Sequence, residues 1–514
     1  MEVSPSAVPI AGIVGLGVGI DYALFIVARY RENRAAGRDN TAALSSAMSS
    51  SGAAVVFAGG TVIIAMASLA FTGLGALTSI GLATAIVVLS AVAAATTLLP
   101  ALLGLLGDRI DTGRLPRRHH TAKRAEETGW WRFAHRVSGR PWPYLIGAVF
   151  ALVAFAAPAF GMQTAWPAAG DAPSATTYRQ AYDLLDEAFG PGINGPFVVV
   201  VDLEAPGITA DRVPALADDI RANGRIASVS DPLTSADRST MVFDAMPTTG
   251  PADLKTSVAL AEVRDVLPDN VYVTGLTAMT TDLNGQLSDT LPIFMGAVLL
   301  ASFLLLMLVF RSVVVPLKAV VMNMLSIGAA YGVLVAVFQW GWGSSLIGIE
   351  GPTPITSLII VIMFPILFGL SMDYEVFLIS RIREEYLRTG DNTESVARGM
   401  ASTGRVISSG ALIMIAVFLA FVASPVPSLK MLGLGLATAI LVDATLVRMV
   451  LVPATMALLG KANWWLPAWL DKVLPHLNVE GVEEVSKPDQ KVVDATYGQA
   501  IDAPTADTDE LVSR

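Results

Sequence analysis

Gly19-Ile20-Asp21-Tyr22-Ala23-Leu24-Phe25 lies inside an apolar run that is long enough to cross a membrane as a helix. The segment returns about 352 positions later as Gly369-Leu370-Ser371-Met372-Asp373-Tyr374-Glu375-Val376-Phe377. One carboxylate at the centre of a membrane helix costs roughly 2.5–3.5 kcal/mol on insertion scales. Because this cost occurs at matched positions of a repeat, the two segments predict a transport path that moves charge.

The composition is typical of a polytopic membrane protein rather than a soluble enzyme. Of the 514 residues, 53% are hydrophobic and 15% are charged, and the mean hydropathy is +0.59. The chain has no cysteine, which excludes disulfides and cysteine-ligated metal sites. No Walker A motif occurs, and no histidine has acidic neighbours at metal-ligand spacing (His119, His120, His135 and His476). We therefore expect no enzymatic reaction, no metal and no cofactor.

Nine apolar runs are long enough to span a bilayer: 8–28, 53–71, 77–103, 143–161, 290–310, 315–339, 354–379, 406–424 and 430–452. Lys and Arg cluster after the first, third, fifth and seventh runs. Since basic loops stay in the cytoplasm, this alternation predicts a multi-pass protein of the inner (plasma) membrane. It places residues 162–289 outside the membrane and the C-terminus in the cytoplasm.

The runs divide the chain into six parts. These are a first repeat of three helices (1–107), a basic cytoplasmic linker (108–142), a single span (143–161), an extracytoplasmic domain (162–289), five spans (290–460, with the second repeat at 360–460) and a cytoplasmic segment (461–514). Arg and Trp in the linker predict an amphipathic segment that contacts anionic lipid. Trp464, Trp465 and Trp469 predict an interfacial anchor, and residues 477–514 a disordered tail.

The extracytoplasmic part predicts a small α+β domain. We expect strands at 197–202, 225–230, 240–244 and 271–274, and helices at 174–189, 209–223 and 252–266. The order β-α-β-β-α-β is that of a ferredoxin-like split unit with its helices on one sheet face. Residues 277–289 predict an amphipathic helix that leads into the fifth span.

The repeat also predicts additional chain upstream. Residues 8–107 match roughly 360–460, so that Gly81-Leu82-Ala83-Thr84-Ala85-Ile86 returns as Gly435-Leu436-Ala437-Thr438-Ala439-Ile440. The second copy is preceded by a helix, the outward domain and two more helices. The first copy has no such preamble, so we expect about 210 further residues and interpret the chain as the C-terminal two-thirds of a longer transporter. The alternative is a natural short form completed by a partner chain.

The duplicated Asp-Tyr pairs are the candidate proton relay. If the first and seventh helices pack about a pseudo-two-fold axis, Asp21 can meet Tyr374 while Asp373 meets Tyr22, which satisfies four buried polar groups. Burial disfavours a charged carboxylate, so each Asp is suited to take up a proton from outside and release it to the cytoplasm. Four further residues are expected to line this region: Gly17, Phe25, Gly369 and Phe377. The alternatives are purely structural hydrogen bonds or, with few nearby oxygens to support it, a sodium site.

Two other acidic residues lie in apolar helices without a partner in the repeat. Glu375 is expected to pair with a basic residue at the cytoplasmic end, and a place on the proton path is the alternative. Asp443 is expected to form a structural ion pair with Arg381, Arg405 or Arg448. Arg448 follows it by five residues, which is a poor spacing on an α-helix.

The Asp-Tyr segments resemble the MMPL (mycobacterial membrane protein large) family of the resistance-nodulation-division (RND) superfamily. Further matching segments are Phe310-Arg311-Ser312-Val313-Val314-Val315-Pro316, Asp443-Ala444-Thr445-Leu446-Val447-Arg448 and Asn463-Trp464-Trp465. The resemblance implies an RND-like bundle of twelve helices with two porter-type domains, of which this chain matches the fourth to twelfth helices and the second domain. It also implies that Asp21, Tyr22, Asp373 and Tyr374 carry protons.

The resemblance further implies proton-driven export of lipids or other amphiphiles to the cell envelope, often the lipids of actinobacteria. The expected partners are then protons, the amphiphilic substrate and membrane lipids, and no nucleic acid. Envelope accessory proteins or further copies of the chain are left open as partners. The alternatives are an RND-type drug or siderophore efflux pump and a truncated, non-transporting scaffold or lipid sensor.

Overall fold

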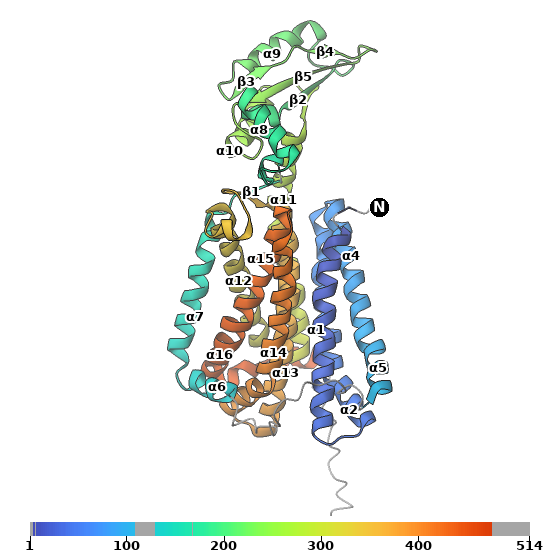
Figure 1. Cartoon of the computed structure of the whole chain (residues 1–514), viewed down its shortest axis with the longest axis vertical. Helices are drawn as coiled ribbons and strands as arrows, with labels where there is room; N and C mark the ends of the chain where they lie inside the picture. The colour runs from blue at the N-terminus through green and yellow to red at the C-terminus, as the bar shows by residue number, and fades with distance from the viewer. Residues whose placement is uncertain (1–3, 6, 108–128, 167, 475–514) are drawn as a thin grey trace, which may run out of the picture.

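A computed structural model describes residues 4–5, 7–107, 129–166 and 168–474 (Figure 1). Several sequence-based expectations lie outside these residues: the basic side chains at 109–124, three of the four histidines and the tail at 477–514. The described part consists of a long helical bundle with a small α+β domain at one end (Figure 1).

Within the described residues, nine helical segments are long and apolar enough to cross a membrane, which confirms the predicted fold class of a polytopic helical membrane protein. The first repeat contains α1 (Ala7–Ala35), α2 continued by α3 (Asn40–Ala47, Ala53–Ala67) and α4 continued by α5 (Gly75–Ala93, Leu99–Leu106). The other spans are α7 (Pro141–Ala156), α11 (Leu276–Phe310), α12 (Val314–Leu334), α13 (Ser357–Thr389), α14 (Asn392–Ala420) and α15 continued by α16 (Pro427–Val442, Val452–Leu459).

Several helices extend beyond the apolar runs that predict them. The second span begins at Asn40 because the Asp39 side chain accepts a hydrogen bond from the Ala42 backbone N–H (2.8 Å) and caps the helix start. The amphipathic segment expected at 277–289 and the fifth span form one continuous helix, α11, with Pro292 inside it. Hydropathy locates the lipid-embedded part of a helix and not its polar ends, which accounts for both differences.

Helix α13 is the centre of the bundle. Of its most apolar window, 94% is buried inside the protein, and it packs against α3 and α14. Helix α1 packs mainly against α4, with Gly15 of α1 in close contact with Val87 of α4, and it also contacts α2 and α14. Helices α7 and α4 lie at opposite edges of the bundle (Figure 1). The two helices that carry Asp-Tyr pairs therefore face each other through side chains rather than through close backbone contact.

The α+β domain has the predicted strand order. Strands β2 (Phe197–Asp202), β3 (Ile226–Val229), β5 (Thr240–Pro247) and β6 (Val271–Thr274) form an antiparallel sheet in the order β3-β5-β2-β6, as in ferredoxin-like split units. Helices α9 (Val213–Arg221) and α10 (Leu254–Asp265) supply the apolar residues that cover the buried face of β2. A short strand β4 (Leu233–Thr234), which the sequence does not predict, pairs with β5. Helix α8 (Thr177–Phe189) buries none of its side chains.

A two-residue parallel pairing connects the domain segment to the bundle. Strand β1 (Thr164–Ala165) pairs with β7 (Ile355–Thr356), which leads directly into α13. The Gln339 side chain strengthens the link, because its Nε2 donates to the Gly161 carbonyl (2.8 Å) and its Oε1 accepts from the Gln163 N–H (2.9 Å). The apolar pattern gives no signal for strands this short.

Apart from the helices of the α+β domain, two short α-helices of the described residues lie outside the spans. Helix α6 (Gly129–Gly139) packs against α14 and α16, with the Trp130 ring close to Gly404. Helix α17 (Ala468–Val473) follows Trp464 and Trp465. Trp464 stacks on Tyr386 (5.6 Å between ring centroids), and the Arg383 guanidinium lies 5.7 Å from the Trp464 ring. Trp130 and Trp464 therefore pack against the protein itself, in addition to any contact with lipid.

Candidate functional site

The two Asp-Tyr pairs form crossed hydrogen bonds between the repeats. The Tyr22 hydroxyl donates to Asp373 Oδ2 (3.0 Å), and the Tyr374 hydroxyl donates to Asp21 Oδ1 (2.7 Å). All four side chains are buried, with exposed fractions of 1–5%. The crossed arrangement is the one that the repeat predicts, while the relay role assigned to it stays a prediction.

The four residues expected to line the relay divide into two groups. Phe25 lies against it, since its ring centroid is 5.5 Å from that of Tyr374 and 4.7 Å from that of Phe377. Gly17 and Gly369 do not line the carboxylates. A β-carbon on Gly17 would approach Phe418 of α14 (3.1 Å), and one on Gly369 would meet Val62 of α3 (2.8 Å). These glycines instead permit the helix contacts that hold α1 and α13 in place.

The structure adds two residues that the sequence analysis does not find. The Thr61 hydroxyl of α3 donates to Asp373 Oδ1 (3.3 Å) and to the Ala58 carbonyl (2.6 Å). Gly410 of α14 lies over the other pair, because a β-carbon there would be 2.9 Å from both Asp21 Oδ1 and the Tyr374 hydroxyl. A single Thr or Gly in an apolar helix carries no signal that separates it from ordinary packing residues.

Gly410→Ala is expected to break the Tyr374–Asp21 hydrogen bond, because the new methyl group occupies the space beside both oxygen atoms. Hydrogen bonds to charged groups contribute about 1.5–3 kcal/mol, so the variant should lose about that much free energy of unfolding. Gly60→Ala is the matched control, since nothing lies within 4 Å of a β-carbon at that helical position. Unfolding in mixed detergent micelles measures both variants. Equal stability of the two would contradict this account of Gly410.

A buried ion pair lies next to Tyr374. Arg448 Nε donates to Asp443 Oδ2 (2.7 Å), and a second guanidinium nitrogen donates to the same oxygen (2.5 Å) and to the Ser371 carbonyl. The guanidinium carbon is 4.9 Å from the centre of the Tyr374 ring, within the range of a cation–π interaction. The pair therefore places a positive charge beside the phenol that binds Asp21.

The expectation that Asp443 and Arg448 are badly spaced is wrong because their helix is not an α-helix. Residues Asp443–Leu451 are π-helical, so hydrogen bonds connect residues five apart and side chains at that spacing meet. Arg381 does not bridge to Asp443. It forms an ion pair with Glu384 (2.6 Å), one turn further along α13.

Glu375 has a basic neighbour on another helix. Its carboxylate interacts electrostatically with Lys318 of α12 and, less strongly, with Arg448. Both Glu375 and Lys318 are buried, and neither Glu375 Oε1 nor Lys318 Nζ has a hydrogen-bond partner among the described residues. Lys318 is therefore a candidate partner, and the expected ion pair of Glu375 stays a prediction.

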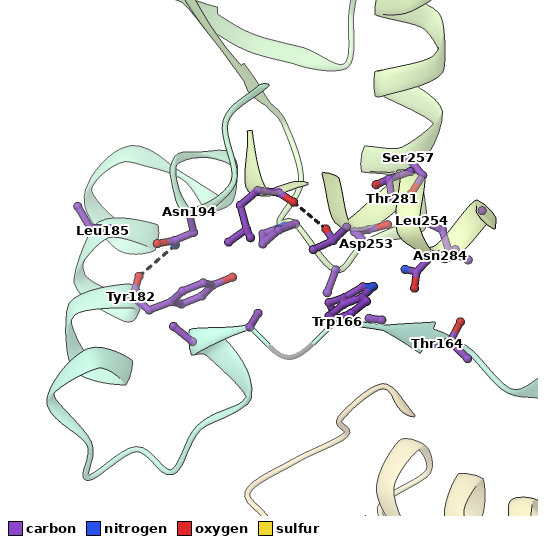
Figure 2. A pocket seen from close by; sticks show the side chains of 18 of the residues that line it. Thr164, Trp166, Tyr182, Leu185, Asn194, Asp253, Leu254, Ser257, Thr281 and Asn284 are labelled. Atoms are coloured by element: carbon purple, nitrogen blue, oxygen red, sulfur yellow. Dashed lines mark hydrogen bonds between the residues drawn. The ribbon is translucent and has the colours of Figure 1, made fainter. Parts of the chain in front are cut away.

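A cavity of about 620 Å³ lies within the α+β domain region and beside the first turns of α11 (Figure 2). Aromatic rings enter it from α8 (Tyr178 and Tyr182) and from the residue after β1 (Trp166). Hydroxyl and amide groups provide much of the remaining polar lining: Thr164, Ser257, Thr280, Thr281 and Asn284. Asp253 is the single carboxylate of this lining, and it caps α10 by accepting from the Lys255 N–H (2.8 Å). Burial raises the pKa of the Tyr182 phenol, which therefore stays neutral. The cavity suits an uncharged polar group attached to apolar surface.

The comparisons with known proteins agree on one family. A profile described as the MMPL family matches residues 1–144 and 171–474. Membrane protein YdfJ of Bacillus subtilis (strain 168) is 36% identical over 501 residues, which cover 96% of this chain and 68% of that protein. The mycolic acid-containing lipids exporter MmpL11 of Mycolicibacterium smegmatis is 37% identical over 480 residues, which cover 91% of this chain and 50% of the exporter. The chain thus spans 50% of the length of the exporter and 68% of that of YdfJ.

A solved structure also has a similar fold. A crystal structure of SecDF, described as a super-membrane-facing form, superimposes with a TM-score of 0.50 at 14% identity, over 95% of this chain and 55% of that chain. This likeness concerns the fold alone.

Proposed function

The chain belongs to the MMPL family, and on this premise we propose that it is a secondary transporter that uses the proton-motive force to export lipids or other amphiphiles toward the cell envelope. It is a multi-pass membrane protein. We place the α+β domain outside the membrane and the C-terminus in the cytoplasm, because Lys and Arg cluster at the opposite ends of the spans. The proposal assigns transport to the chain and no enzymatic reaction.

The single observation that carries the proposal is the crossed hydrogen bonding of Asp21 and Asp373 at the centre of the bundle. Inside a membrane a carboxylate is far easier to bury when it is protonated. Gain and loss of a proton therefore change which of the crossed hydrogen bonds is favourable, and with them the preferred packing of α1 and α13. A membrane potential supplies roughly 2.3 kcal/mol per charge per 100 mV, which is comparable to one charged hydrogen bond.

The substrate class is supported by the domain cavity. Its aromatic rings offer apolar contact, and its hydroxyl and amide groups offer hydrogen bonds, with one carboxylate already used as a helix cap. This lining suits the uncharged, hydroxyl-bearing head of an amphiphile. The M. smegmatis relative is an exporter of mycolic acid-containing lipids, which supports a lipid rather than a soluble drug as the substrate.

Gly285→Phe is expected to reduce lipid transport by proteoliposomes because it fills the cavity. Gly285 lines the cavity on α11, and nothing lies within 4 Å of a β-carbon at that position, so a larger side chain enters the empty space without a clash. The assay follows a fluorescent lipid, chosen after mass spectrometry of co-purifying lipids, with and without an imposed proton gradient. Wild-type transport should require the gradient and stop when an uncoupler is added.

Gly296→Phe is the matched control for this experiment. It introduces the same side chain on the same helix, also into open space, but away from the cavity. Gradient-independent transport by the wild type would overturn the proton coupling. Equal transport by the two Phe variants would overturn the assignment of the cavity.

A further inference from the structure

A second, small cavity lies on the side of the Asp-Tyr pairs that faces away from the α+β domain, toward the ends of the helices that carry Lys and Arg. It measures about 20 Å³ and is lined by Ser50, Ser51, Ala54, Phe377, Ser380, Arg381 and Glu384. The residues come from the start of the second span and from α13. A space of this size accommodates about one water molecule, which needs roughly 10–15 Å³ by the same measure.

Two hydroxyl groups in this cavity lack partners. Ser51 Oγ and Ser380 Oγ are buried, and neither forms a hydrogen bond with any residue that the structure describes. A buried hydroxyl without a partner is costly, and ordered water usually satisfies such groups. Ser50, by contrast, donates to the Ser46 carbonyl (2.9 Å). The cavity therefore has both the volume and the polar groups that one water molecule requires.

The cavity continues a row of side chains along α13. Tyr374, Phe377, Ser380 and Glu384 follow one another at spacings of three or four residues, so they share one face of the helix. Phe377 is the apolar member of the row, and it packs against Phe25. Phe377 lines the cavity and contacts Phe25, which in turn contacts Tyr374 of the relay. Arg381 and Glu384 form an ion pair on the cavity lining, with the Glu384 side chain 38% exposed.

The two repeats differ at this point. Displacement by 352 positions relates the Arg381–Glu384 pair to Arg29–Glu32, which forms the same contact (2.8 Å). The same displacement relates Ser380 to Ala28, which has no hydroxyl group. The cavity thus lies between the two repeats, and the hydroxyl group that the second repeat contributes to it at Ser380 is absent from the matching position of the first.

We propose that Ser51 and Ser380 hold a water molecule that takes the proton from the Asp-Tyr cluster and passes it to solvent beside Glu384. This inference rests on the proposed proton coupling. The donor carboxyl group loses its O–H proton and becomes a carboxylate, the water passes a proton onward to solvent, and no other bond changes. Transfer occurs when the Phe377 ring turns away from Phe25. Ser51 and Ser380 act as positioning residues for the water.

Water access is tested with single cysteines, since the natural chain has none. Ser51→Cys and Ser380→Cys are exposed to silver ions, which are small enough to follow water, from the Glu384 side of oriented vesicles. The modified fraction is read by alkylating the remaining thiols after denaturation. Ser68→Cys is the control, matched most closely to Ser51, because Ser51 and Ser68 are both buried but Ser68 donates to the Ala65 carbonyl (2.6 Å) and lies outside the cavity.

We expect both cavity thiols to react at least tenfold faster than the control. Reaction at the control rate, or from the domain side only, would overturn the water site. In gradient-driven transport, Ser380→Ala should lower the rate about tenfold, and Ser380→Thr, which keeps a hydroxyl group, should restore it. Full transport by Ser51→Ala/Ser380→Ala would overturn the proton path.

The labelling also separates this inference from the proposed function. Silver access does not depend on proton coupling, so it should persist in Asp373→Asn. Access without any proton-coupled transport would overturn the proposed function and keep the water site. Coupled transport without access would overturn the water site alone.

Discussion

Asp373→Asn and Asp21→Asn are each expected to reduce gradient-driven lipid transport to the level measured without a gradient. Asn keeps the size of the side chain and can still accept the hydrogen bond from Tyr22 or Tyr374, but it cannot take up or release a proton. At 100 mV one coupled proton contributes roughly 2.3 kcal/mol, equivalent to about 50-fold accumulation of the substrate. Proteoliposomes with an imposed potential measure this loss directly.

The control for this prediction is Asp289→Asn. Asp289 is an exposed carboxylate on α11, outside both the relay and the domain cavity. It should transport at the wild-type rate, and all three variants should fold equally well, as judged by size-exclusion chromatography. If both relay variants transport normally, the carboxylates serve only to join the helices, and the relay is wrong.

Arg448→Met is expected to lower the free energy of unfolding by about 3–5 kcal/mol, because it leaves Asp443 buried without its partner. The variant also removes the cation beside the Tyr374 ring and the donor to the Ser371 carbonyl. Reversible unfolding in mixed micelles measures the change.

Two further variants make the measurement specific. Arg388→Met removes an Arg from an ion pair of similar length, Arg388–Glu385 (2.6 Å), but the Arg388 side chain is 58% exposed, so the variant should cost less than about 1 kcal/mol. Asp443→Leu/Arg448→Met removes both buried charges and should recover much of the lost stability. A double variant as unstable as Arg448→Met would show that the effect comes from lost packing and not from the unpaired carboxylate.

The sequence is sufficient to predict features that follow from the internal repeat or from the spacing of apolar residues along the chain. Apolar runs locate the spans, and a run of four consecutive valines locates β2 at Phe197–Asp202 with its predicted boundaries. The crossed contacts of Asp21 and Asp373 follow from symmetry, because two copies of a segment related by a two-fold axis must exchange their partners. Neither conclusion requires the coordinates.

Other features depend on local geometry that no period encodes. The Asp443–Arg448 pair needs a π-helical turn, and nothing in the segment separates that turn from an α-helix before the backbone is seen. The electrostatic interaction of Lys318 with Glu375 arises only because α12 packs beside α13. Thr61 and Gly410 owe their places to helix rotation, which hydropathy does not determine. The domain cavity likewise comes from segments far apart in the chain.

The pairing of β1 with β7 couples the position of the domain to that of the central helix α13. Strand β7 ends at Thr356 and α13 begins at Ser357, so no flexible residue lies between them to absorb movement. Tyr374 follows Ser357 by 17 positions, or roughly 25 Å along a helix. A displacement of β1 is therefore transmitted through β7 and α13 to the Tyr374 side chain. A change in the hydrogen bonds of Tyr374 is transmitted to the domain along the same helix in the opposite direction.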